Sequence, residues 1–293
     1  MKRIFSYSFL LLSMMLACRT GYSPSRLPGA SSQLFPGYES LPPDEQRLAD
    51  TLLAYALDHE ALYSLADTLK PISTVRQMTF AVEDSTLRDG TAEVALNQAA
   101  LDSVRRVQRV LTALSGGRLE FVLMPFQHLY ERTKRHFEVV VCRKDLIDRK
   151  LRQYAPFFGQ WGLTEGASPG ILLILTEYEA RNDRYRAYGY LFGYPKHTVD
   201  FFVQASQEEQ KTGQFVKRDF FHNPTYASTK GYFTYTIPKG YQPTKVDSAI
   251  YRRASFTLAE YRQRRSQYKM GTGLQAVRLL REWEAVWSSA GKK

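Results

Sequence analysis

Only two cysteines, Cys18 and Cys142, occur in the 293 residues of this chain, so disulfide bonds cannot be the main constraint on its fold. The fold has to depend on an apolar core instead. The composition allows such a core, because 44% of the residues are hydrophobic and 13% are aromatic. The same composition argues against intrinsic disorder for the bulk of the chain.

Residues 1–18 have the order of a secretory leader. Lys2 and Arg3 precede a mostly apolar run that ends at Leu16, and Ala17 and Cys18 follow. The run is too short to be read as a membrane span. Its last residues, Met-Leu-Ala-Cys, resemble the cleavage box of bacterial lipoprotein signal peptides. This resemblance implies cleavage before Cys18, a diacylglyceryl group on its sulfur and an acyl chain on its amino group. Cys142 would then have no disulfide partner.

The resemblance also implies a cellular location, the cell envelope. More than one acyl chain anchors a protein stably, because each buried CH2 contributes about 0.8 kcal/mol. In such lipoproteins an Asp after the cysteine favours retention in the inner membrane, but Arg19 stands there. We therefore expect the periplasmic face of the outer membrane in a host with two membranes. The alternative is an ordinary cleaved signal peptide with no lipid on Cys18.

Three parts of the chain can be distinguished. Residues 1–17 are the signal peptide, and residues 18–43 are the lipidated cysteine and a flexible tether rich in Gly, Pro and Ser. Residues 44–293 are expected to form a globular α+β domain. A change of character near 177–183 allows a subdivision there.

Apolar periodicity predicts the elements of the first half. A helix is expected over 44–70, a strand over 75–82, a helix over 92–115, strands over 119–125 and 137–142, and a helix over 144–159. The continuous apolar run Ile171–Leu175 is typical of a strand buried on both faces. The order from about 75 to 176 is β-α-β-β-α-β, which matches a ferredoxin-like core.

In the second half, aromatic residues crowd the segment 185–194 around two glycines. We interpret Arg184–Phe192 as a strand and Pro195 as the start of a helix to about 207. A further strand is expected over 232–237. The C-terminal portion is helical, over about 246–270 and 274–287.

Three constellations are candidates for catalysis. Histidine beside a carboxylate suits acid–base or metal chemistry, which His59 and Glu60 offer on the first helix. His197 and Asp200 lie three residues apart at a helix start and share a face. His222 is expected in a polar loop, where ligands often bind. For each of them a structural role is the alternative: a packed histidine, a solvated helix start and a plain turn.

The net charge of +11 falls almost entirely in the second half of the chain. A basic surface attracts anionic lipid or glycan, and export argues against nucleic acid as the partner. Lys196 and His197 would bind an anion at their helix start, together with the free backbone N–H groups there. Arg264 and Arg265 would contribute from the last helices, with a solvated helix face as the alternative.

Other motifs have little support. No nucleotide-binding motif occurs, so we expect no cofactor. His128 and His136 do not make a zinc site by themselves, and we expect no metal. Cys142 belongs to an apolar strand, which favours an inert core thiol over a nucleophile. We therefore expect a non-enzymatic envelope lipoprotein that binds a ligand or partner, with a lipid-tethered hydrolase of envelope material as the alternative.

The lipoprotein assignment predicts that Cys18→Ser yields a protein without lipid. Growth with labelled palmitate should label the wild-type chain, and the variant should carry no label and partition into the aqueous phase. Equal labelling of both proteins would contradict the assignment.

Overall fold

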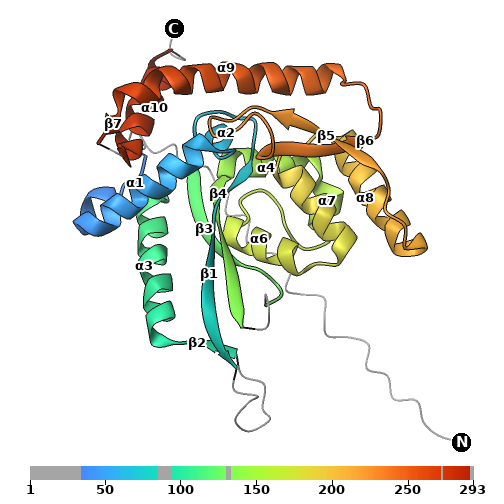
Figure 1. Ribbon diagram of the computed structural model, residues 1–293, viewed down its shortest axis with the longest axis horizontal. Coiled ribbons are helices and arrows are strands. Elements are labelled where there is room, and N and C mark those ends of the chain that lie inside the picture. The colour runs from blue at the N-terminus through green and yellow to red at the C-terminus, as the bar shows by residue number, and fades with distance from the viewer. Residues whose placement is uncertain (1–33, 85–93, 130–132, 272, 291–293) are drawn as a thin grey trace, which may run out of the picture. The chain divides into compact units, whose positions relative to one another are not determined.

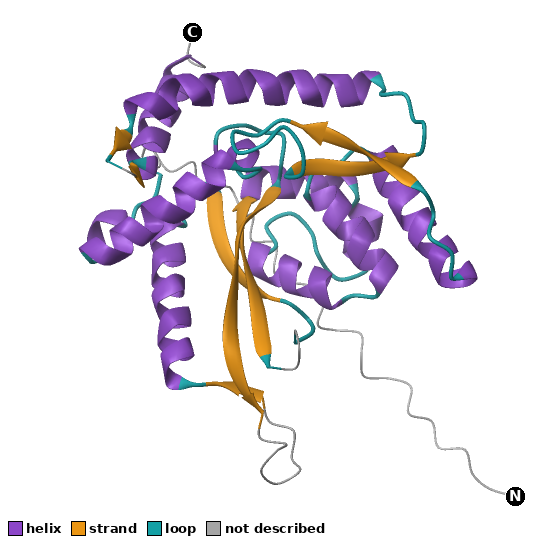
Figure 2. Cartoon of the chain, viewed as in Figure 1, coloured by secondary structure: helices purple, strands orange, loops and turns teal. Residues whose placement is uncertain are grey.

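A four-stranded antiparallel sheet with helices on both faces is the centre of the computed structural model (Figure 1). The structure describes residues 34–84, 94–129, 133–271 and 273–290, so Cys18 lies outside the described residues. Residues 32–293 form one unit. Helices and antiparallel sheets together confirm the α+β class (Figure 2).

The order of the strands across the sheet is β2 (Val94–Leu96), β1 (Ile72–Asp84), β4 (Lys134–Arg143) and β3 (Leu119–Pro125). Successive side chains of β4 alternate between two cores, since Val139 and Val141 belong to one and Val140 and Cys142 to the other. A strand covered on both faces needs apolar residues at every position, which explains the apolar run in β4.

The larger core joins one face of the sheet to α1 (Pro43–Asp58), α3 (Gln98–Leu114), α9 (Lys245–Gln267) and α10 (Ala276–Ala290). In α1 the buried residues Ala49, Leu52, Leu53 and Ala56 recur at helical spacing. The Asn97 side chain caps α3 by accepting a hydrogen bond from the N–H of Ala100.

The second core covers the opposite face with α4 (Lys144–Gln153), α5 (Ala155–Gly159), α6 (Pro169–Tyr178) and α7 (Arg181–Leu191). Cys142 is fully buried in this core, and burial raises the pKa of its thiol. The structure therefore places Cys142 in an unreactive setting, as the sequence predicts.

Two expected strands are helices. Ile171–Leu175 lies in α6 and Arg184–Phe192 lies largely in α7, so the strand predictions are wrong and the ferredoxin-like order is not confirmed. Pro169 stands in the first turn of α6, where proline is tolerated. Leu172 and Leu173 are buried while Ile171 is 59% exposed. A short apolar run does not distinguish a strand from a half-buried helix, and here the packing decides.

The N-terminal boundaries also differ from expectation. The first helix ends at Asp58 instead of residue 70, and a short helix, α2 (Leu62–Leu65), follows. Part of the segment 18–43, expected to be a tether, packs on the body of the protein, because Leu34 and Phe35 are buried in the larger core. A 3-10 turn, η1 (Tyr38–Ser40), leads into α1. Arg281 of α10 donates to the carbonyl oxygens of Leu34 and Phe35.

The rest of the chain forms a hairpin flanked by long helices. The elements are α8 (Lys196–Thr212), the antiparallel strands β5 (Arg218–Asn223) and β6 (Phe233–Pro238), and the two-residue strands β7 (Lys269–Met270) and β8 (Gly273–Leu274). Strand β5 lies in a segment where the sequence predicts no strand. None of the helices in the described ranges has the length and apolar character of a membrane span.

Two buried or half-buried aspartates hold α9 against the N-terminal helices. Arg265 donates two hydrogen bonds of 2.8 Å to Asp58, and Arg253 donates to both carboxylate oxygens of Asp67 at 3.0 Å. Asp67 is fully buried. Part of the positive charge of the C-terminal helices therefore serves to fix them to the body of the protein.

Candidate functional site

An open groove of about 270 Å³ lies between α7, α8 and β6. Aromatic rings make up most of its lining, with three threonines and two small or apolar residues between them. The lining residues are Tyr185, Tyr188, Gly189, Phe192, Tyr194, Thr198, Val199, Phe202, Thr234, Tyr235 and Thr236. A concave, mostly apolar surface with a few polar groups is typical of a ligand-binding site.

Four of these rings form a continuous row. The ring centroids of Tyr188 and Phe192 are 5.8 Å apart, those of Phe192 and Tyr194 are 5.6 Å apart, and those of Tyr194 and Tyr235 are 5.6 Å apart. The first two pairs are stacked with interplanar angles of 26° and 23°. The row presents an extended, rigid aromatic wall at low conformational-entropy cost.

Two glycines allow this wall to form. A Cβ on Gly189 would lie 2.6 Å from a methyl group of Val199, so only glycine lets α7 approach α8 this closely. Gly193 has a φ of +78°, and a Cβ there would lie 2.6 Å from the carbonyl oxygen of Leu69. The turn between α7 and α8 therefore packs directly on the segment that precedes β1.

Lys70 lies behind the aromatic wall and is fully buried. Its Nζ lies 4.8 Å, 5.1 Å and 4.6 Å from the ring centroids of Phe192, Tyr194 and Phe233. An ammonium near aromatic faces is attracted by their negative quadrupole, more strongly when it is removed from water. Burial lowers the pKa of Lys70, and the charge of Glu60 opposes that shift.

Glu60 is the carboxylate partner of Lys70. Lys70 Nζ donates to Glu60 Oε2 at 2.8 Å, while the N–H and the hydroxyl of Thr74 donate to Oε1 at 3.2 Å and 2.7 Å. Both carboxylate oxygens of Glu60 therefore accept hydrogen bonds, and the donors, Lys70 and Thr74, lie just before and within the start of β1. Because the pair is enclosed and its hydrogen bonds are made, we assign Glu60 a structural role.

Glu138 is a second acidic group close to the wall. It lies on β4 opposite Met124, and Tyr188 contacts Met124 Sδ at 3.3 Å while donating a hydrogen bond of 2.9 Å to Glu177. Burial, and to a smaller extent the charge of Glu60, raises the pKa of Glu138 to about 7. Within the described ranges no hydrogen bond or ion pair reaches the Glu138 carboxyl.

Most side-chain hydroxyls of the groove are already paired. Tyr235 donates to the buried Asp247 at 2.7 Å, Thr198 donates to the carbonyl oxygen of Pro195 at 2.8 Å, and Thr234 is 2.9 Å from Nδ1 of His222. The hydroxyls of Tyr194 and Thr236 have no hydrogen-bond partner among the residues that the structure describes. Side chains therefore offer few free polar groups to a ligand.

The five predicted catalytic residues do not form one cluster. In the described ranges no side-chain hydrogen bond, ion pair or ring contact joins any two of them. His59 stacks on Tyr55, and His197 is 2.6 Å from the hydroxyl of Tyr241. Asp200 pairs with Arg186 at 2.9 Å and with Lys196 at 2.5 Å, while Glu60 pairs with Lys70.

His222 is the candidate that lies beside the groove. It is opposite Thr234 in the β5–β6 register, so both side chains lie on one face of the hairpin. Phe220, which is opposite Thr236, lies on the same face and is 54% exposed. His222 and Phe220 therefore extend the lining toward β5.

The predicted anion-binding residues have partners within the chain. Lys196 is held by Asp200, Arg265 by Asp58, and the guanidinium of Arg264 lies 5.2 Å from the ring centroid of Trp283. His197 is 3.6 Å from the buried Asp247. Anion binding by these residues stays a prediction, and it would have to compete with these contacts.

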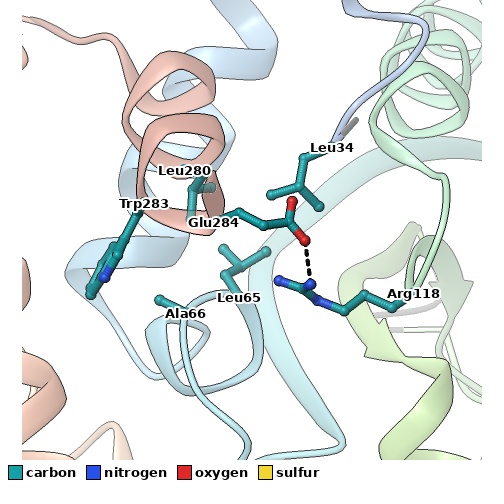
Figure 3. Close-up of a pocket in the computed structure, with 7 residues that line it drawn as sticks. All are labelled: Leu34, Leu65, Ala66, Arg118, Leu280, Trp283 and Glu284. Atoms are coloured by element: carbon teal, nitrogen blue, oxygen red, sulfur yellow. Dashed lines mark hydrogen bonds and ion pairs between the residues drawn. The ribbon is translucent and has the colours of Figure 1, made fainter. Parts of the chain in front are cut away.

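Two other hollows are poorer candidates. The one in Figure 3 lies between Leu34, Ala66 and Leu280, is crossed by the ion pair of Arg118 and Glu284, and has a volume of about 10 Å³. That volume holds no more than about one water molecule. A larger hollow borders Tyr38, Asp50 and Arg281, whose polar atoms pair with other side chains. Nowhere in the described ranges do three metal-ligating side chains converge.

The sequence missed the importance of Lys70 and of the aromatic wall. The crowding of tyrosines around Gly189 and Gly193 was the available signal for the wall. For Lys70 no local signal was available, because its burial depends on Glu60, Phe192 and Phe233 from other segments.

The enclosed pair predicts strong coupling between Lys70 and Glu60. Lys70→Met or Glu60→Gln alone should lower the free energy of unfolding by roughly 3–5 kcal/mol, because each leaves a buried group without its partner. The free energy of unfolding of the double variant should fall by much less than the sum of the losses in the two single variants. Urea unfolding measures all three, with the exposed pair Arg105 and Asp102 as the control, where changes should stay within about 0.5 kcal/mol. Additive losses at Lys70 and Glu60 would contradict the coupling.

Glu138 predicts a pH-dependent stability. An unfolded glutamate has a pKa of about 4.3, so between about pH 4.3 and pH 7 the folded chain binds more protons than the unfolded one. The stabilisation is complete below this window and is lost as the pH rises through it. Glu138→Gln should flatten that slope and exceed the wild type in unfolding free energy above pH 7 by roughly 3–4 kcal/mol. Urea unfolding at pH 5 and pH 8, with the exposed Glu208→Gln as control, tests this. Parallel pH profiles for wild type and Glu138→Gln would refute it.

No protein-family model matches this chain, and no curated protein and no solved structure matches it. Its function therefore has to be inferred from its own residues.

Proposed function

We propose that this chain is a lipid-tethered protein of the bacterial cell envelope that binds a ligand, without chemical conversion, in the groove between α7, α8 and β6. The lipid on Cys18 and the envelope location rest on the leader sequence. The binding function rests on one observation above all, the continuous aromatic wall from Tyr188 to Tyr235 that borders an open groove.

Rigidity of the wall supports binding over a purely structural role. The rings are fixed from behind by the Lys70 ammonium and at the turn by Gly193, so the surface is formed before a ligand arrives. A preformed surface reduces the entropy that binding has to overcome.

A lipid-tethered hydrolase of envelope material is the second candidate. The observation that favours it is Glu138, a half-buried carboxyl with a pKa of about 7 and no partner in the described ranges. A carboxyl that exchanges its proton near neutral pH suits general acid–base chemistry. Release of a product from a bound envelope fragment would favour this candidate over simple binding.

The groove can be tested under native conditions with the fluorescent probe anilinonaphthalene sulfonate, which combines aromatic rings with one sulfonate group. Tyr185→Ala removes a lining ring that lies 5.0 Å from the ring of Phe202, so the probe should bind about 3–10-fold more weakly. Tyr178→Ala is the matched control, because Tyr178 is exposed on the neighbouring helix α6 and does not line the groove. Equal affinity of wild type and Tyr185→Ala would contradict a binding site in the groove.

A further inference from the structure

One end of the groove is bordered by an exposed arginine. Tyr185 of α7 and Phe202 of α8 are the lining residues closest to the start of α7 and the end of α8, and their ring centroids lie 5.0 Å apart. Arg181 lies one helical turn before Tyr185, on the same face of α7. Its Nε donates a hydrogen bond of 3.2 Å to the Tyr185 hydroxyl. The guanidinium of Arg181 therefore stands at the rim of the groove, beside a lining ring.

Two more arginines lie against the rings at this end. The guanidinium carbons of Arg181 and Arg184 lie 5.8 Å and 5.9 Å from the ring centroid of Tyr185. The guanidinium carbon of Arg218, on β5, lies 5.7 Å from the ring centroid of Phe202. At such distances a guanidinium is attracted by an aromatic ring, which holds these charges close to the groove. We refer to Arg181, Arg184 and Arg218 as the arginine end of the groove.

Carboxylates balance the arginine end only in part. Glu209 forms an ion pair with Arg218, and a carboxylate oxygen of Glu177 lies 3.8 Å from a nitrogen of Arg184. In the part of the chain that the structure describes, no carboxylate forms an ion pair with Arg181. Three guanidinium groups thus meet two carboxylates, and one positive charge remains unbalanced.

Neighbouring groups do not cancel this charge. Asp183 lies two residues from Arg181, so it faces the opposite side of α7. Arg186 and Lys196 share the single carboxylate of Asp200, so this neighbouring group also carries an excess positive charge. Because α7 begins and α8 ends on this side of the groove, their helix dipoles oppose each other. The side chains therefore determine the sign of the charge here.

The acidic groups near the aromatic wall lie on the side of Tyr188. The Tyr188 hydroxyl donates to Glu177 and contacts the sulfur of Met124, which is opposite Glu138 in the β3–β4 register. A negative group of a ligand is disfavoured beside these carboxyls and favoured beside the arginine end. The faces of the aromatic rings between them suit an apolar part of the ligand.

We propose that the groove binds a small amphiphilic anion, with its apolar part along the aromatic wall and one terminal anionic group at the arginine end. A guanidinium presents a fork of N–H donors that fits a carboxylate or phosphate, and Arg181 has this fork available. A neutral sugar fits less well, because the hydroxyls of Thr198, Thr234 and Tyr235 already have partners. This inference rests on the proposed binding function and names its ligand class.

The test compares two fluorescent probes that have the same rings. Anilinonaphthalene sulfonate carries one negative charge, and N-phenyl-1-naphthylamine is its uncharged counterpart without the sulfonate. The protein is the full chain with Cys18→Ser, which avoids a detergent that would take up both probes. The substituted residue lies outside the unit of residues 32–293 that contains the groove. Both affinities are measured at low ionic strength for this chain and for further variants of it.

We expect Arg181→Gln to weaken binding of the sulfonate about 3-fold, as befits an exposed charge, and to leave binding of the uncharged probe unchanged. Arg181→Lys should restore most of the affinity for the sulfonate. The control is Arg262→Gln, at an exposed arginine of α9 outside the groove lining, which should change neither affinity. Decanoate and decyl phosphate should displace the sulfonate more strongly than decanol, and the better of the two anions identifies the terminal group as carboxylate or phosphate.

Several results would overturn the inference. Equal weakening of both probes by Arg181→Gln would show that Arg181 only shapes the groove. Unchanged affinity of Arg181→Gln for the sulfonate, or displacement by decanol as strong as by the two anions, would show that charge is not recognised. In these cases Tyr185→Ala still weakens both probes, and the groove remains a binding site. If Tyr185→Ala binds both probes as tightly as the chain without it, the proposed function itself has failed.

Discussion

The enclosed ion pair of Lys70 and Glu60 is the interaction on which the rest of the structure depends. Glu60 lies in the corner after α1 and accepts a hydrogen bond from Thr74 at the start of β1. The Lys70 ammonium lies near the rings of Phe192 and Tyr194, at the turn between α7 and α8, and near the ring of Phe233 in β6. Tyr194 packs against both hydrophobic cores. A charge removed from water is expensive unless it is paired and hydrogen bonded, so these segments have only one arrangement that satisfies it.

This arrangement determines the shape of the groove. The same two rings that lie near the Lys70 ammonium form part of the groove wall, so the position of the wall follows from the position of the buried charge. On the other side, Thr234, Tyr235 and Thr236 of β6 border the groove. The groove thus lies between the aromatic wall and the hairpin.

The sequence predicted the elements whose periodicity is local. The strand Leu119–Pro125 was predicted with its observed bounds, and both ends of α9 were located to within three residues. Helix α3 was also predicted, but it begins only at Gln98, because the strand β2 (Val94–Leu96) occupies part of the helix expected over 92–115. The prediction failed at α6 and α7. Apolar or aromatic residues are so dense there that the spacing fits a helix and a strand equally well, and packing decides which of the two forms. The site was less predictable still. Lys70 is buried because Glu60, Phe192 and Phe233 converge on it from three segments, and no local pattern contains that information.

The most direct test of this account is a heteronuclear NMR measurement of the Lys70 side-chain nitrogen at neutral pH. We predict a charged ammonium whose protons exchange slowly with water and show nuclear Overhauser contacts to the rings of Phe192, Tyr194 and Phe233. A rapidly exchanging ammonium without contacts to these rings would contradict the account, because the groove wall would then lack the charge that is proposed to hold it.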